Sequence, residues 1–119
     1  MENSINIKKV DFNPPFLEHL YLIYLGKKQN TQTSIENYLK INFDKKYVIE
    51  KINFITNEFI HCTDLNYFEE LVEEHESIIS KVINIEPIQK STFNDYLDGK
   101  IKSLGSWGGD FILVTSRDN

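Results

Sequence analysis

The sequence predicts an α+β fold, in which one antiparallel sheet of about four strands has helices packed on one face. Apolar runs typical of strands lie near both ends of the chain, and two long helical patterns lie between them. Hydrophobic residues make up 40% of the 119 residues, an ordinary share for a globular protein. A chain of this length supports one core, so we expect residues 1–119 to form a single domain.

The first strands are expected near the N-terminus. Apolar residues in a polar setting predict a short strand over residues 5–10, which Asn13-Pro14-Pro15 ends because proline fixes φ and lacks an N–H. Residues 16–25 are rich in aromatic and branched side chains and are closed by Gly26, so we expect a strand over their second half. The near-continuous apolarity of this run predicts a central strand that is covered on at least one face.

Helical patterns fill the middle of the chain. Residues 31–34 offer caps for a short helix that ends near Lys40, and Asp44 caps a second helix. The second helix has apolar residues at spacings of four, three and four, namely Val48, Ile52, Ile55 and Phe59. Thr63-Asp64 caps a third helix that continues to about Ile83, and its acidic residues between Glu69 and Glu76 are interpreted as a solvated face.

The C-terminal part predicts a hairpin. Pro87 closes the helical region, and a brief helix is expected from Ser91 to Leu97 before Gly99. Residues 100–104 alternate like a strand, residues 111–114 form a second apolar strand, and an antiparallel hairpin is the economical connection. Strands at both ends with helices between them favour a split, ferredoxin-like arrangement.

Charge and composition exclude several classes of protein. A net charge of −5 gives no electrostatic footprint for nucleic acid or for an anionic membrane surface. The single cysteine, Cys62, excludes a disulfide-stapled scaffold. Residues 1–12 have no apolar core of signal-peptide length, and the longest apolar run, residues 20–25, is too short to span a bilayer. We therefore expect a cytoplasmic location and no nucleic-acid or membrane partner.

The segment Gly105-Ser106-Trp107-Gly108-Gly109 is the strongest candidate for a functional element. Three glycines allow close approach of the backbone to a ligand, and successive N–H groups form a concavity suited to anions. Ser106 adds a hydroxyl donor, and Lys102 adds a nearby positive charge. A hairpin turn, with Trp107 filling a gap in the core, explains the same residues equally well. The segment matches neither standard phosphate-binding pattern.

The run of residues 101–113, Ile-Lys-Ser-Leu-Gly-Ser-Trp-Gly-Gly-Asp-Phe-Ile-Leu, resembles the C-terminal glycine motif of the GHMP kinases. This superfamily includes galactokinase, homoserine kinase, mevalonate kinase and phosphomevalonate kinase. The run is closer still to a GHMP-kinase-like group of Bacteroidetes, the GYDIA family, and residues 20–30 are similar to a segment of the same group. The two matches occur in the expected order, which implies that nearly the whole chain corresponds to the C-terminal domain of such a kinase.

The resemblance implies a function for this domain. A complete GHMP kinase uses ATP and magnesium to phosphorylate a small alcohol such as mevalonate, and the glycine segment lines the cleft beside the substrate and the transferred phosphate. The residues that the resemblance assigns to substrate and phosphate binding are Lys102, Ser103, Gly105, Ser106, Gly108 and Gly109. None of them is assigned as catalytic. Trp107 and Asp110 depart from the glycine- and alanine-rich family pattern, which leaves the substrate open.

The family's nucleotide-binding motif, of the Pro-x-x-x-Gly-Leu-Gly-Ser-Ser type, belongs to an N-terminal domain that residues 1–119 do not match. The family's catalytic aspartate, where present, belongs to that domain too. We therefore expect the isolated chain to be inactive and to need no cofactor of its own. The expected partner is the missing N-terminal kinase domain, or a second copy joined through an exposed apolar face. The alternative is a stand-alone α+β binding or interaction module without catalysis.

Other residues with chemical potential have simpler interpretations. Lys27-Lys28 could contact a phosphate, but a solvated loop explains the pair more simply. His61, Cys62 and Asp64 include metal-ligand types, but zinc sites generally need two spaced pairs, so we expect a helix C-terminus with a half-buried cysteine. His75 is expected on the surface, and the sequence offers it no serine or cysteine partner for nucleophilic catalysis.

Overall fold

The computed structural model describes residues 9–26, 44–104 and 111–117. Within them the elements are η1 (Leu17–His19), β1 (Leu20–Tyr24), α2 (Lys45–His61), α3 (Leu65–Ile83), α4 (Ile88–Ser91), β2 (Ile101–Leu104) and β3 (Phe111–Thr115). The helix expected before Lys40, the pair Lys27-Lys28 and the glycine segment 105–109 lie outside the described residues. So does most of the strand expected over residues 5–10, and Val10 itself is not in a strand.

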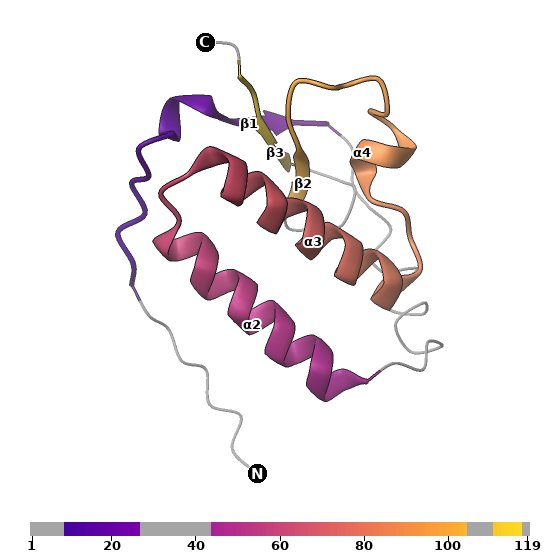
Figure 1. The fold of residues 1–119 in the computed structure, drawn as a ribbon. Helices are drawn as coiled ribbons and strands as arrows, with labels where there is room; N and C mark the ends of the chain where they lie inside the picture. Colours follow the sequence, from indigo (N-terminus) through magenta and orange to yellow (C-terminus); the bar gives the residue numbers. More distant parts are fainter. Residues whose placement is uncertain (1–8, 27–43, 105–110, 118–119) are drawn as a thin grey trace.

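The described strands form one antiparallel sheet in the order β1-β3-β2 (Figure 1). Leu113 of β3 lies opposite Leu22 of β1 on one side and opposite Lys102 of β2 on the other. Because both outer strands run antiparallel to β3, β1 and β2 run parallel to each other. The α+β class and the predicted β2–β3 pairing are confirmed. Three of the four expected strands lie in the described part of the chain.

Among the described residues, β1 does not have the predicted central position. The run was expected to form a central, covered strand, but in the described part of the chain β1 is an edge strand, and four of its five residues are exposed. Leu22 and Tyr24 are 68% and 64% exposed. Continuous apolarity indicates a strand that avoids water, but it does not reveal whether the cover comes from the same chain.

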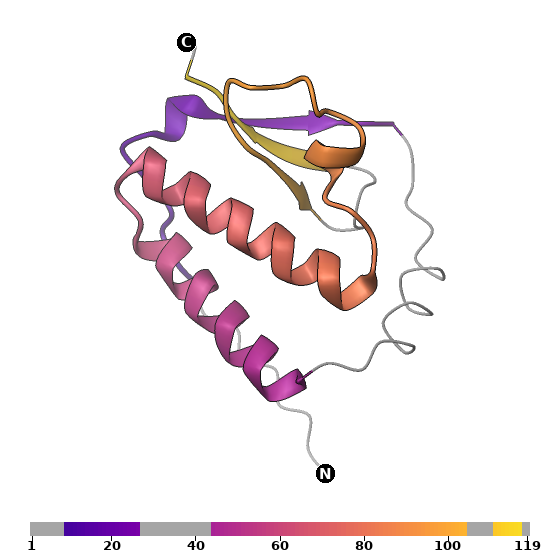
Figure 2. The same cartoon turned by 45° about the vertical axis from the view of Figure 1, so that its right-hand side comes forward.

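The two long helices were predicted correctly, including their caps. Asp44 and Asp64 each accept a hydrogen bond from a backbone N–H three residues later, at Tyr47 and Tyr67 respectively, with N···O distances of 3.1 Å. Figures 1 and 2 show α2 and α3 side by side and antiparallel, with α3 between α2 and the sheet. The helices therefore form a hairpin whose second arm contacts the sheet.

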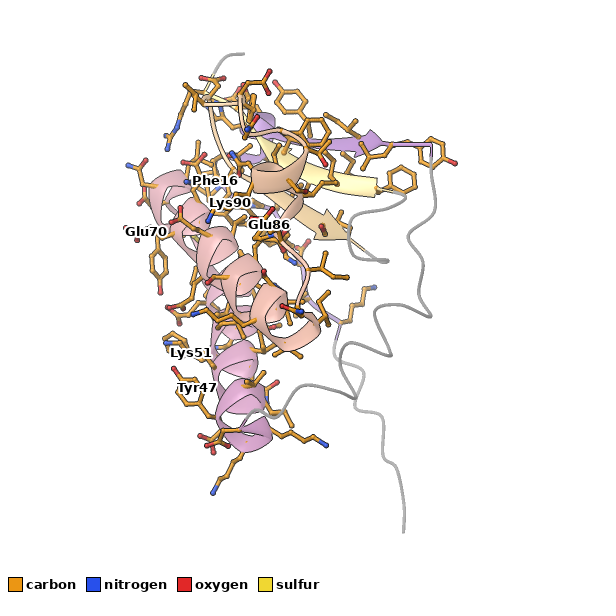
Figure 3. All side chains as sticks on the ribbon, turned by 90° about the vertical axis from the view of Figure 1, so that its right-hand side faces the viewer. Phe16, Tyr47, Lys51, Glu70, Glu86 and Lys90 are labelled. Carbon is orange, nitrogen blue, oxygen red and sulfur yellow. The ribbon has the colours of Figure 1, made fainter. Side chains whose placement is uncertain are left out.

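Side chains of this hairpin also meet on its outer side. Tyr47 and Lys51 project from α2 to the side on which Glu70 projects from α3 (Figure 3). Lys51 lies 3.6 Å from a carboxylate oxygen of Glu74 on α3, and both side chains are partly exposed. Such exposed pairs contribute little to stability, so this seam holds the helices less firmly than the buried core does.

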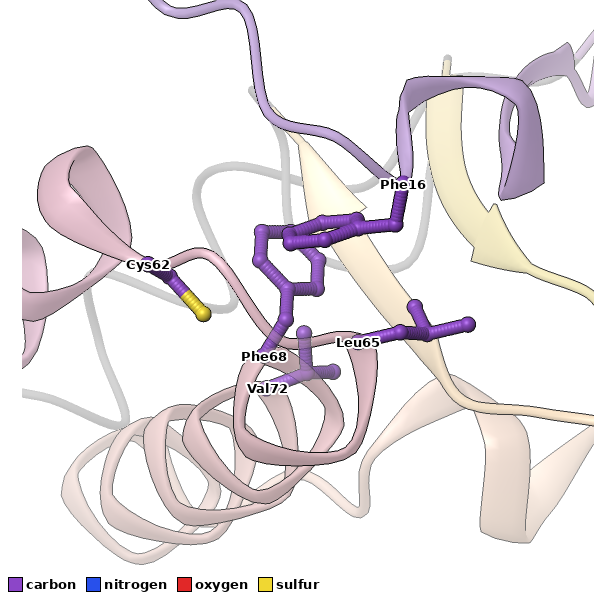
Figure 4. Close-up of a cluster of buried hydrophobic side chains, with 5 residues drawn as sticks. All are labelled: Phe16, Cys62, Leu65, Phe68 and Val72. Carbon is purple, nitrogen blue, oxygen red and sulfur yellow. The ribbon is translucent and has the colours of Figure 1, made fainter.

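One buried cluster joins the start of α3 to the sheet and to α2. Its members, drawn in Figure 4, are Phe16, Cys62, Leu65, Phe68 and Val72. The rings of Phe16 and Phe68 lie 5.1 Å apart between centroids, in a tilted arrangement. Leu20 of β1 and Leu113 of β3 pack against the cluster, so it fixes α3 on one face of the sheet.

A second cluster covers the opposite face of the sheet. Ile112 and Val114 of β3 point away from α3, because successive strand residues alternate between faces, and they pack with Ile101 and with Ile88 of α4. Helices therefore lie on both faces rather than on one. The helix expected from Ser91 to Leu97 is wrong, because α4 spans Ile88–Ser91 and ends where that helix was expected to begin. Pro87 precedes α4, and the carbonyl of Pro87 accepts the N–H of Ser91 at 3.1 Å.

Candidate functional site

A buried polar cluster joins α3 to β2 at the point where the chain enters the glycine segment. It consists of His75 and Glu76 on α3 and Lys102 and Ser103 on β2, which we call the Glu76 cluster. The backbone N–H of Ser103 donates to Oε1 of Glu76 at 3.1 Å. The Nζ of Lys102 lies 3.3 Å from Nδ1 of His75 and 3.9 Å from Oε2 of Glu76. The cluster thus ties the middle of α3 to the strand before residue 105.

Burial dominates the electrostatics of this cluster. Glu76 is 3% exposed, and its Oε2 finds no hydrogen-bond donor among the described residues. Burial raises the pKa of Glu76 to about 7, against the lowering effect of the Ser103 N–H and of Lys102. Burial, and secondarily the charge of Lys102, lowers the pKa of His75 to about 4. At neutral pH the imidazole of His75 is therefore uncharged, while the carboxyl group of Glu76 titrates near this pH.

Glu76 has a counterpart one step earlier along β2. The N–H of Ile101 donates to Oε1 of Gln89 on α4 at 2.9 Å, and Nε2 of the same amide donates to the carbonyl of Gly99 at 2.9 Å. Residues 101 and 103 direct these N–H groups away from β3, because outward-facing groups alternate along an edge strand. Side chains from α3 and α4 therefore occupy the outer edge of β2, which we call the guarded edge.

A second polar cluster closes the other end of α3. The hydroxyl of Thr115 donates to Glu69 and accepts the N–H of Lys100 at 2.8 Å, while Glu69 also pairs with Arg117. A Cβ at residue 99 would lie 2.0 Å from the carbonyl oxygen of Thr115, so this approach requires glycine. These contacts hold the end of β3 against residues 99–100 and have a structural role.

The interpretation of residues 69–76 as a solvated acidic face is wrong at both ends, since Glu69 and Glu76 are buried. The sequence did contain the signal. Leu65, Glu69, Val72 and Glu76 follow one another at spacings of four, three and four, which puts both carboxylates on the apolar stripe of α3. The acidic residue type suggested exposure to solvent, whereas the positions of Glu69 and Glu76 in the helical period place them on the buried side of α3. His75, expected on the surface, is half-buried against Lys102 and Phe59.

Of the residues assigned to substrate and phosphate binding, the structure describes Lys102 and Ser103. Gly105, Ser106, Gly108 and Gly109 lie outside the described residues. The ammonium of Lys102 is directed to α3, and Ser103 is buried. Both residues thus act in the contact between β2 and α3, at the entrance to the glycine segment.

The other candidates from the sequence are engaged in helix ends. Cys62 is buried and its thiol donates to the carbonyl of Asp64 at 3.2 Å, while His61 contacts the carbonyl of Asn57 at 2.9 Å. Over residues 9–26, 44–104 and 111–117, no three His, Cys, Asp or Glu side chains are placed to hold a metal ion. None of the helices in these ranges is both long and apolar enough to cross a membrane.

A pocket of about 550 Å³ lies beside the guarded edge, between α3, α4 and residues 94–101. Val72 and Ile101 contribute apolar surface, and Lys81, Lys90 and Lys100 contribute positive charge. Lys100 is already paired with Glu73 at 2.6 Å. The pocket offers room for a small molecule.

No family model matches the chain, and neither a curated protein nor a solved structure is significantly similar to it. The functional argument therefore depends on the glycine motif and on the geometry of the strands that flank it. The glycine motif lies in the chain between the end of β2 and the start of β3, so this end of the sheet is the candidate site.

Proposed function

We propose that this chain is the C-terminal half of a GHMP-type kinase and contributes one wall of an active site that another domain completes. The main support is the position of the glycine motif. Residues 105–110 connect β2 to β3, which are paired neighbours, and a long helical hairpin precedes them in the chain. That order agrees with the resemblance to the GHMP C-terminal motif over residues 101–113.

In this proposal the backbone N–H groups of the glycine segment face the substrate and the transferred phosphate. Phosphoryl transfer depends on positioning and on stabilisation of the phosphate charge, so a row of backbone donors is a suitable contribution. Lys102 and Ser103 hold the strand that leads into the segment, through Glu76. The nucleotide, the magnesium ion and any catalytic aspartate belong to the other half.

The proposal extends to the fold. Two parallel strands on either side of an antiparallel third, with helices in the crossover, form the split β-α-β unit of ferredoxin-like sheets. A fourth strand in such a sheet would pair with β1. The alternative function, a stand-alone interaction module, is favoured by one observation, namely the exposed apolar surface of β1.

Nuclear magnetic resonance tests the proposal on the isolated chain. Mevalonate and its phosphate are added to the labelled protein, and we expect the amide signals of Gly105, Gly108 and Gly109 to shift. Magnesium-ATP alone is expected to leave them in place. Gly108→Ala is expected to abolish the shifts and to leave the remaining spectrum unchanged.

Two results would overturn the proposal. One is turnover of ATP and a small alcohol by this chain alone, because the nucleotide cradle is assigned elsewhere. The other is the absence of any shift at the glycine amides with a panel of small alcohols and their phosphates. Loss of folding in Gly108→Ala would indicate that the segment is only a turn.

A further inference from the structure

The pocket beside the guarded edge has walls that hydrogen bonds hold in place. Its volume of about 550 Å³ falls within the range of about 300 to 1,000 Å³ that is usual for small-molecule sites. The side-chain amide of Gln89 on α4 donates to the carbonyls of Tyr96 and Gly99, at 3.3 and 2.9 Å. The same amide accepts the N–H of Ile101 at 2.9 Å, and α4 lies beside β2 (Figures 1 and 2). One side chain thus fixes two walls of the pocket, so the fold itself sets the shape.

Apolar side chains line much of this pocket. Val72 of α3 and Ile101 of β2 are almost fully buried, whereas Leu97 is 90% exposed. Pro87 and Tyr96 complete the apolar lining. Burial of apolar surface is favourable, so an apolar ligand that covers Leu97 removes from water a surface that the described chain leaves open.

The charged groups of the pocket leave an excess of positive charge. Each of the two carboxylates in the lining has an ammonium group nearby: Glu73 pairs with Lys100 at 2.6 Å, and Glu76 lies 3.9 Å from an ammonium of β2. Lys81 of α3 and Lys90 of α4 also line the pocket, and neither forms an ion pair with the described residues. The whole chain carries a charge of −5, so this excess is a local feature.

We propose that this pocket binds a small organic anion, namely a carboxylate or a phosphate monoester with an apolar body. The apolar body lies against Ile101 and Leu97. The anionic head group lies at the rim, where Lys81 and Lys90 reach it with ammonium groups on flexible stems. The site is formed by α3, α4 and residues 94–101, so the inference does not depend on the proposed kinase function or on the glycine segment.

Nuclear magnetic resonance titration tests the proposal with four probes that have the same apolar body. They are octanoate, octyl phosphate, octanol and octylammonium, each added below the concentration at which it forms micelles. We expect octanoate or octyl phosphate to shift the amide signals of Ile101 and Lys90 until the site is saturated. The anion should bind about tenfold more tightly than octanol, since two exposed ion pairs contribute up to about 1 kcal/mol each. Octylammonium should bind more weakly than octanol.

A matched pair of double variants tests the role of the two lysines. Lys81→Gln with Lys90→Gln is expected to weaken binding of the anion about tenfold and to leave the affinity for octanol unchanged. Lys9→Gln with Lys46→Gln changes the net charge equally, but these exposed lysines do not line the pocket. The second variant is therefore expected to bind like the wild type.

Leu97→Ala tests the apolar part of the site. Because Leu97 is exposed, the variant should keep its circular dichroism spectrum, but it should bind octanoate and octanol more weakly by the same factor. Three results would each overturn the proposal: no saturable shift with either anion, equal affinities for the anions and octanol, or equal losses in the two double variants. None of them bears on substrate shifts at the glycine amides, so the two proposals fail separately.

Discussion

The two edges of the sheet are built in opposite ways. At β2, side chains from two helices accept the outward N–H groups, and one of them is the buried carboxylate of Glu76. At β1, the described residues provide no such cover, and apolar side chains face solvent. The difference teaches that, within the described residues, helix side chains accept the outward N–H groups of one edge strand, whereas the other edge strand exposes apolar side chains.

The guarded edge also has an energetic cost. Burying the carboxylate of Glu76 is unfavourable, because Oε2 has no hydrogen-bond donor among the described residues and lies 3.9 Å from the ammonium of Lys102; the raised pKa of Glu76 reflects that cost. The contact nevertheless holds β2 against α3 directly before the glycine segment. The cost at β1 is of another kind, namely the exposure of apolar side chains to water.

The largest loss of stability that we expect at constant pH from a substitution at either edge is that of Gln89→Leu. It removes the acceptor for the N–H of Ile101 and the donor to the carbonyl of Gly99, and leaves both groups unpaired. We expect the free energy of unfolding to fall by about 2 kcal/mol, since unpaired buried polar groups carry their full desolvation penalty. Urea denaturation measures it.

The control for this substitution is Lys90→Leu, at the exposed next position of α4. Its effect is expected to stay below about 0.5 kcal/mol. Equal effects of the two substitutions would mean that the amide of Gln89 does not protect the edge of β2.

Glu76→Gln is expected to have an effect that depends on pH. The folded chain holds the proton of Glu76 more tightly than the unfolded chain does, because burial raises the pKa from 4.5 to about 7. The wild-type chain therefore loses stability as pH rises through this range, and the glutamine variant does not. Between pH 4.5 and pH 8 the variant should gain about 3 kcal/mol relative to the wild type.

This gain is measured by denaturation at both pH values and by the carboxyl carbon resonance of Glu76. His75 contributes the opposite slope, since its pKa is lowered from 6.5 to about 4 and stability is lost as pH falls through that range. That contribution is common to both chains and largely cancels in the difference. A difference that does not change with pH would contradict the raised pKa of Glu76.

The smallest expected effect is that of Tyr24→Ala on β1. Its ring contacts Phe111, but both side chains are largely exposed, so the cross-strand pair should contribute about 0.5 to 1 kcal/mol. Unfolding is measured at a concentration where the chain is monomeric, with the exposed Tyr47→Ala as control. A loss above about 2 kcal/mol would mean that β1 is part of the protected core.

Much of the fold could be predicted from local residues. Asp44 and Asp64 begin their helices as expected, and the spacing of Val48, Ile52, Ile55 and Phe59 predicted α2. These features depend on residues that are close together in the sequence, so the sequence is enough to predict them. The short helix expected from Ser91 to Leu97 was wrong, since the observed helix is Ile88–Ser91. Its buried residue, Ile88, packs against residues of β2 and β3, and that contact cannot be read from the local sequence.

The candidate site could be predicted only in part. The sequence identifies the glycine segment and Lys102 as candidates, because they lie close together in the chain. The contact of Lys102 with His75 joins positions 27 residues apart and could not be predicted from it. The same separation explains why Glu76 was assigned to solvent: an acidic side chain is usually exposed, and only a partner strand changes that outcome.

The sequence by itself determined the α+β class, the two long helices with their caps and the strand pair around the glycine segment. Those features arise from spacing, capping and turn composition, which act over a few residues. The tertiary structure alone decided that β1 lies at the edge of the three described strands, that α4 covers the second face and that Glu76 is buried at the outer edge of β2. These depend on which distant segments meet, and the free energy of such contacts is not contained in any short stretch of the chain.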